Sequence, residues 1–296
     1  MKLIAIPVAA VLLLAGCAAP APDNGRLSVV ASTNVYGSIA TAIGGKLVDV
    51  TSIISDPSQD PHSFEGSARV QLALSKANIV IENGGGYDDF VNTMLSSASN
   101  PAAAVLNASD ISGLDEHPGT GRFNEHVWYD FDAMGKLVDK LESTLAGLDP
   151  SSAAVFAANA ATFHAGLDAL STNVATLKQR VAGAGALVTE PVPLYLLSAA
   201  GFVNVTPPAF SQAVEAGTDV APDVLAQTLK TIADGSATIL VYNEQTSGPQ
   251  TEVVLKAAKA APIAVVGVTE TLPDGQKDYL GWMQSVIDAI SGSLVG

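Results

Sequence analysis

The sequence predicts an α/β fold with two lobes, each a mainly parallel sheet flanked by helices, joined by one long rigid backbone helix. Three observations predict this fold. Short apolar runs alternate with segments of helical spacing, which is the order typical of parallel α/β sheets. The alternation occurs twice, on either side of residues 152–181, a stretch with one glycine and no proline. The 296 residues are 48% hydrophobic and only 15% charged, as expected when sheets are buried on both faces.

The first repeat opens with a predicted strand at 27–32, an apolar run that contains β-branched residues. Helical spacing at 35–43 stops at Gly44-Gly45, and glycine commonly follows the last residue of a helix. The later strands and helices of this repeat are predicted in the same way, from apolar runs and from helical spacing. We expect strands at 48–54, 79–81 and 104–107, and helices at 68–77 and 132–148.

The central stretch is rich in Ala and Leu, and as one helix it would be about 45 Å long. The alternation restarts after it, where we expect strands at 186–188, 202–205, 238–242 and 263–268, and helices at 195–200, 222–233, 250–259 and 278–291. The predicted division is a leader at 1–17, a tether at 18–26, an N-terminal lobe at 27–150, the interlobe helix at 151–182 and a C-terminal lobe at 183–296.

The leader has the features of a secretory signal peptide. Met1-Lys2 precedes an apolar stretch, Leu3–Ala15, which is shorter than the roughly 20 residues of a membrane span. It runs into Leu14-Ala15-Gly16-Cys17, which resembles the bacterial lipobox, where the cysteine is lipidated, and Cys17 is the only cysteine of the chain. We therefore expect a protein anchored by lipid to the extracytoplasmic face of a bacterial cell membrane.

The charge balance excludes some functions. The chain has 14 Lys and Arg against 29 Asp and Glu, a formal net charge of −15. Nucleic acid is therefore not an expected partner, because affinity for phosphate backbones comes from Lys and Arg. A single cysteine forms neither an internal disulfide nor a cysteine-based zinc site. An acidic surface favours small cations or basic partners.

Polar residues near the ends of predicted strands are candidates for a binding site, because ligands of parallel sheets bind beyond the carboxyl ends of the strands. His62 and His126 come from the first repeat, and Glu190 and Glu270 from the second. Two imidazoles and two carboxylates suit a divalent transition-metal ion. Each of them alone is more often a surface residue, so the spacing leaves both a metal site and a solvated surface open.

Several segments resemble, in order and spacing, the solute-binding lipoproteins of bacterial zinc and manganese ABC importers, the cluster A-I family with a rigid helical backbone. The resemblance covers nearly the whole mature chain. The segments that carry it are DPHSFE at 60–65, EHVWYD at 125–130, Asp149-Pro150 before the long helix, LVTE at 187–190 and VTE at 268–270.

The resemblance implies capture and delivery of a metal ion. It implies that Zn²⁺ or Mn²⁺ is bound as transported cargo by His62, His126, Glu190 and Glu270. It also implies that the chain is a monomer and not an enzyme, and that its partners are the ABC permease and ATPase subunits. Both ions stay open. In this family two histidines with two carboxylates are typical of manganese binders, yet carboxylate is also an ordinary zinc ligand.

The sequence departs from the family pattern at two places. Glu270 stands where the family usually has Asp, which makes Asp274 the alternative fourth ligand. Many zinc importers carry a His-rich loop ahead of the second histidine, whereas here that region holds only His117, which we expect in an exposed loop. His164 falls within the long helix and is expected to be structural.

Two other functions are weighed against metal capture. A binding lipoprotein of the same architecture for an iron chelate or an organic ligand would call for aromatic and Arg side chains, but aromatics are only 5% of the chain. A metallohydrolase needs a general base near a metal-bound water, and Glu244 is the residue that could take this role. The sequence contains neither HExxH nor a nucleophile elbow.

Overall fold

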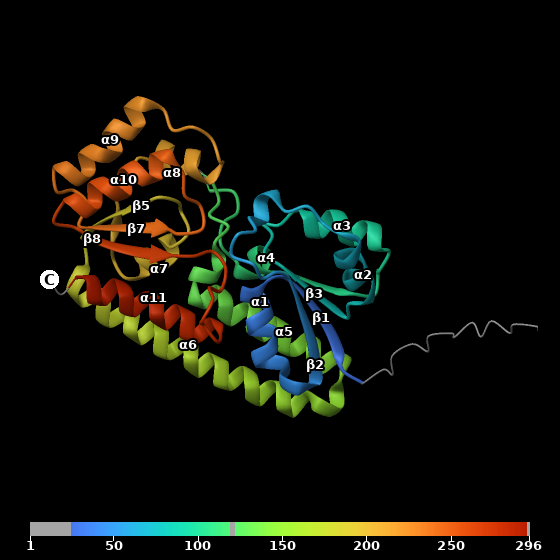
Figure 1. The fold of residues 1–296 in the computed structure, drawn as a ribbon. Coiled ribbons are helices and arrows are strands. Elements are labelled where there is room, and N and C mark those ends of the chain that lie inside the picture. Colours follow the sequence, from blue (N-terminus) through green and yellow to red (C-terminus); the bar gives the residue numbers. More distant parts are fainter. Residues whose placement is uncertain (1–24, 119–121, 295–296) are drawn as a thin grey trace, which may run out of the picture.

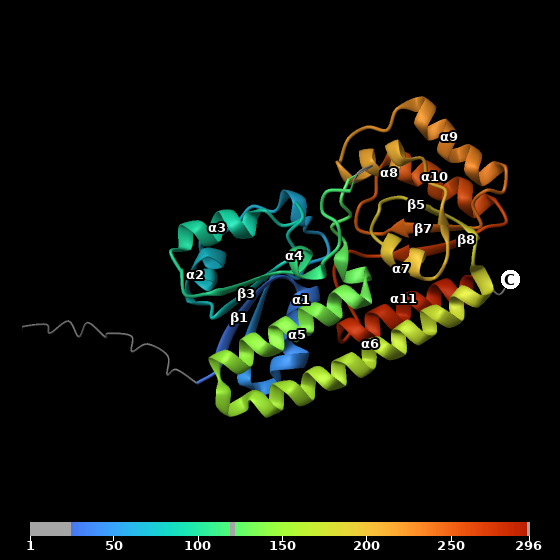
Figure 2. The ribbon, with the colours of Figure 1, turned by 180° about the vertical axis from the view of Figure 1, so that it is seen from behind.

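The computed structural model describes residues 25–118 and 122–294, and it contains two four-stranded sheets (Figures 1 and 2). The strand orders are β2-β1-β3-β4 and β6-β5-β7-β8, and the strand pairs of the described residues are parallel. The predicted fold class is therefore confirmed. Cys17, the leader and most of the tether lie outside the described residues.

The first sheet alternates its side chains between two layers of helices. Val29 and Ala31 belong to the core cluster shared with α1 and α5, whereas Val30 packs with residues of α2 and α3, as the two-residue period of a strand requires. The strands are β1 (Leu27–Thr33), β2 (Val48–Ile54), β3 (Ile79–Glu82) and β4 (Ala104–Asn107). The helices are α1 (Asn34–Gly44), α2 (Ala68–Lys76), α3 (Phe90–Ala98), α4 (Ala108–Ser112) and α5 (Phe131–Leu148), with short 3₁₀ turns η1 (Gly45–Leu47), η2 (Pro61–Ser63) and η3 (Val127–Tyr129).

The second sheet repeats this arrangement. Leu187 and Leu240 pack under α9 and α10, while Val188 and Val241 face the core cluster that includes α6 and α11. The strands are β5 (Gly185–Val188), β6 (Val203–Asn204), β7 (Ile239–Asn243) and β8 (Ala264–Val268). The helices are α7 (Leu194–Ala199), α8 (Pro208–Glu215), α9 (Pro222–Ala233), α10 (Pro249–Ala260) and α11 (Tyr279–Ser293).

Helix α6 (Ala153–Val181) begins after the turn η4 (Pro150–Ser152), extends for 29 residues and runs alongside both sheets (Figures 1 and 2). Its buried residues recur every three or four positions, which gives a continuous apolar stripe. They are Phe156, Ala160, Phe163, Leu167, Leu170, Val174, Leu177 and Val181. One hydrophobic cluster joins this stripe to strands of both sheets. No helix of the described residues combines the length and the apolar character of a membrane span.

The sequence missed three helices, α3, α4 and α8. Helix α3 is rich in Ser, Asn and Thr, and its N-cap Asp89 makes no side-chain capping hydrogen bond, so its local preference for helix is weak. Helices α4 and α8 have only five and eight residues, too few to establish a periodic pattern. The strand expected at 202–205 is shortened to two residues.

We expect Gly185→Ala to lower the free energy of unfolding by about 2 kcal/mol, as overpacking does. A Cβ at this position of β5 would lie 1.9 Å from the backbone oxygen of Ser236, so the chain must shift. The urea midpoint of the metal-free protein measures this change. The matched control is Gly147→Ala at an exposed position near the end of α5, where a Cβ meets nothing within 4 Å. This variant should gain up to about 1 kcal/mol. Equal midpoints for the two variants would contradict this account.

Candidate metal centre

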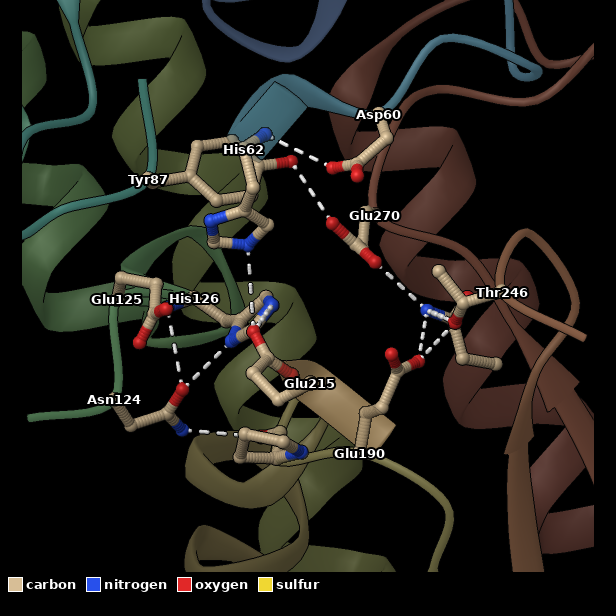
Figure 3. Close-up of polar contacts among 12 residues, drawn as sticks. Asp60, His62, Tyr87, Asn124, Glu125, His126, Glu190, Glu215, Thr246 and Glu270 are labelled. Atoms are coloured by element: carbon tan, nitrogen blue, oxygen red, sulfur yellow. Dashed lines mark hydrogen bonds and ion pairs between the residues drawn. The ribbon is translucent and has the colours of Figure 1, made fainter. Parts of the chain in front are cut away.

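The four predicted residues lie around one cleft, where the carboxyl edges of the two sheets face each other (Figure 3). His62 is on η2, which follows β2. Asp60 caps this turn, because its Oδ1 accepts the backbone N–H of His62 at 2.9 Å. The ring of Tyr87 packs edge-on against the imidazole, with centroids 5.0 Å apart. These contacts fix the direction of the His62 side chain, which is 28% exposed.

His126 precedes η3 and is fully buried. Its Nδ1 lies 2.8 Å from Oδ1 of Asn124, and the same oxygen accepts the backbone N–H of His126. Because this oxygen can only accept, Nδ1 carries the hydrogen and Nε2 carries the lone pair. Burial lowers the pKa of His126 well below its usual value, and the charge of His62 adds to that effect. Nε2 is buried without a hydrogen-bond partner, as a metal-binding imidazole requires.

Glu190 and Glu270 follow β5 and β8 and are both buried. The side-chain amide of Asn243, at the end of β7, donates to both carboxylates, at 2.5 and 2.7 Å. The hydroxyl of Thr246 donates to Glu190, and that of Tyr87 donates to Glu270 at 3.2 Å. Burial raises the pKa of both carboxyl groups to about 7, and the charge of Glu190 contributes to the shift at Glu270. Two oxygen donors are thus held in place but are readily protonated.

Glu215, the last residue of α8, joins this group although the sequence did not single it out (Figure 3). Its Oε1 lies 3.4 Å from Nε2 of His62 and 3.6 Å from Nε2 of His126. Burial raises the pKa of Glu215 to about 7. Burial disfavours the charged form of His62, but Glu215 and more distant carboxylates outweigh it, so the pKa of His62 rises to about 9.

The place of Glu215 at the end of α8 marks it as unusual, although the sequence did not predict this helix. A negative charge at the C-terminal end of a helix is unfavourable, because the helix dipole is negative there. Such a local conflict is expected at functional positions. Glu125 also belongs to this group, because one ligand atom each from His62, Glu125 and Glu215 lie within 4.8 Å of one another.

The other candidate residues from the sequence, all of them among the described residues, make no hydrogen bond or ion pair with His62, His126, Glu190 or Glu270. Asp274 and Glu244 are exposed and line neither of the two large cavities of the described residues. His117 is exposed and lines one of these cavities. His164 lies on α6, where its Nε2 is 2.7 Å from Asp139.

Two cavities meet at the site. One, of about 630 Å³, is lined by the carboxylates of Asp60, Glu190 and Glu270. The other, of about 860 Å³, is lined by Glu125, His117 and Arg122 among others. His62 and Glu215 line both cavities. The contact between His62 and Glu215 therefore lies at the boundary of the two cavities.

The chain is similar in sequence to two manganese-binding lipoproteins. The chain is 27% identical over 154 residues to the manganese-binding lipoprotein MntA of Halalkalibacterium halodurans, a match that covers 50% of each protein. It is 28% identical over 165 residues to MntA of Bacillus subtilis, covering 53% of each. The chain thus spans about half the length of the curated relatives that it matches.

Solved structures share the fold. The periplasmic zinc-binding protein TroA of Treponema pallidum has a TM-score of 0.75 at 19% identity, covering 92% of this chain and all of that one. The Mn-bound S38A mutant of a periplasmic metal-binding protein from Candidatus Liberibacter asiaticus has a TM-score of 0.73 at 16% identity, covering 91% and 100%. The family model described as "Zinc-uptake complex component A periplasmic" matches residues 29–293, and the chain belongs to this family.

Proposed function

We propose that this chain is the extracytoplasmic substrate-binding protein of an ABC importer, which captures Zn²⁺ or Mn²⁺ between its lobes and delivers it to a membrane permease. One observation carries the proposal. Two imidazoles of the first lobe, His62 and His126, and two buried carboxylates of the second, Glu190 and Glu270, lie around one cleft (Figure 3). These four residues are the proposed ligands.

The metal-free cleft holds protons where the ion is to bind. The pKa of Glu190 and of Glu270 is about 7, so near neutral pH these buried carboxyl groups are partly neutral. A divalent ion binds the deprotonated forms of its ligands, so binding displaces these protons. Asn124 and Asn243 keep the ligands oriented, and the amide of Asn243 sets the separation of the two carboxylates.

Delivery requires the permease to distinguish the loaded from the empty protein. The shared core around α6 opposes a wide hinge motion, so the change on loading is small and local.

We propose that the chain acts as a monomer, that the permease and its ATPase are its partners, and that Cys17 anchors it by lipid to the outer face of the membrane. The division into lobes at 27–150 and 183–296 belongs to the same proposal.

The structure favours metal capture over the two other functions. The carboxylates that line the first cavity would repel an anionic iron chelate. A hydrolase would need its base beside the bound ion, but Glu244 is exposed and outside both cavities. The convergent imidazoles and carboxylates are the donors that a bare transition-metal ion requires.

We expect His126→Ala and His62→Ala each to weaken binding of MnCl₂ and of ZnCl₂ by about 100-fold or more. Each variant removes a proposed ligand, and losing even an outer partner of a ligand typically costs 10–100-fold in affinity. Calorimetry with a competing chelator measures the affinity, and circular dichroism of the metal-free variants checks the fold. The matched control is His164→Ala, which removes a histidine of α6 that pairs with Asp139 of α5. Unchanged affinity in either ligand variant, with the fold intact, would refute the assignment.

We expect the affinity for Mn²⁺ to fall as the pH is lowered from 8 to 6. The pKa of Glu190 and of Glu270 is about 7, so below pH 7 the ion competes with protons for both carboxyl groups, and above pH 7 their competition disappears. The pKa of His62 is about 9, so displacement of its proton adds to the fall in affinity over the whole range. For each proton that the ion displaces, the affinity falls about tenfold per pH unit below the pKa of the group that held the proton. Calorimetry in buffers of different ionisation enthalpy counts the protons released. An affinity that does not change with pH would contradict the proposed competition.

A further inference from the structure

Glu215 is not explained by a four-ligand site. Its Oε1 faces the Nε2 atoms of His62 and His126, at 3.4 and 3.6 Å. The contact with His62 is an ion pair when that imidazole is protonated, whereas the contact with the neutral His126 is longer than an ordinary hydrogen bond. The second oxygen of Glu215 is buried without a hydrogen-bond partner, as is Nε2 of His126. Burying polar atoms without partners costs free energy. A single group that interacts with both Glu215 and His126 would remove this cost.

The contact with His126 identifies the kind of group. Nε2 of His126 carries a lone pair, because Nδ1 holds the hydrogen that is directed at Asn124. A carboxylate oxygen likewise offers lone pairs. Two acceptors that face each other are stabilised by a cation between them.

The distances fit two ligands of one ion. Nitrogen and oxygen donors bind a transition-metal ion at about 2.1 Å. Two such donors about 110° apart around the ion are separated by about 3.4 Å, by trigonometry on those bond lengths. The separations of Glu215 Oε1 from the two imidazole nitrogens, 3.4 and 3.6 Å, are of this size.

We propose that Glu215 is a fifth ligand of the captured ion and that it shifts the selectivity of the site toward Mn²⁺ relative to Zn²⁺. This inference rests on the proposed function and deepens it. With Glu215, the protein supplies two nitrogen donors and three carboxylates. Zinc sites are usually satisfied by four donors in a tetrahedron, whereas Mn²⁺ suits carboxylate oxygens and takes higher coordination numbers.

The position of Glu215 on the chain supports this role. It ends α8 in the second lobe, whereas both of its imidazole partners belong to the first lobe. Its side chain lines both cavities, while Glu125 lines only the second. Glu215 is therefore the carboxylate placed between the histidines of one lobe and the carboxylates of the other (Figure 3).

The test is Glu215→Gln, which keeps the shape of the side chain and removes its charge. We expect the affinity for MnCl₂ to fall by about 10–100-fold and that for ZnCl₂ by less than about threefold, so that the ratio of the two affinities changes at least threefold. Bound Mn²⁺ should also gain a water molecule in place of the carboxylate, which raises the relaxation rate of water protons. The matched control is Glu252→Gln on α10, an exposed carboxylate that accepts a hydrogen bond from Tyr242 at 2.9 Å, and it should leave both affinities unchanged.

Equal loss for the two ions would overturn the proposal, because it would mean that Glu215 contributes only negative charge. Unchanged Mn²⁺ affinity would overturn it as well. If thermal melting shows that Glu215→Gln is unfolded, Glu215→Asp replaces it, because the shorter acid keeps the charge but cannot reach both histidines, and it should show the same selective loss. His126→Ala in the same experiment separates the two proposals. If it abolishes binding of both ions while Glu215→Gln changes nothing, only the fifth ligand is refuted.

Discussion

The cleft depends on the apolar stripe of α6. Eight buried side chains of this helix contribute to one core that also contains residues from both sheets, so the two carboxyl edges are held face to face. A site assembled from two lobes normally has an uncertain width, because domain interfaces tend to move. Here hydrophobic packing sets that width, so the polar side chains on the two edges keep their spacing.

The polar groups in the cleft are unfavourable in the absence of a neutralising cation. The carboxyl groups of Glu190 and Glu270 and the imidazole of His126 are buried in this cleft, beside the half-buried carboxyl groups of Glu125 and Glu215, and burial favours their uncharged forms. Amides of Asn124 and Asn243 and hydroxyls of Thr246 and Tyr87 satisfy some of these groups. The unpartnered atoms of His126 and Glu215 remain. The protein thus tolerates an unfavourable polar cluster where a divalent cation would turn it into a favourable one.

The sequence predicted the features that depend on local pattern. Strands such as 48–54 and 104–107 keep their predicted limits, and the long helix differs by one residue at its start, because apolar periodicity decides them. The residues His62, His126, Glu190 and Glu270 were selected by their place near strand ends, and the structure brings them to one cleft. Glu215 was missed because α8 has only eight residues and its partners lie far away along the chain. No local pattern encodes such a contact.

The last helix has a consequence for how the chain folds. The hydroxyl of Tyr279, at the start of α11, donates to the backbone oxygen of Trp128 at 2.6 Å, and its N–H donates to Oγ of Ser38 at 2.9 Å. A buried backbone group of the N-terminal half therefore depends on residues near the end of the chain. Removing α11 would take away this donor and the side chains that α11 contributes to the shared core, so the N-terminal half depends on the end of the chain for part of its packing. One hydrophobic cluster also contains residues of both sheets, so the two halves should unfold together, although their sheets share no strand.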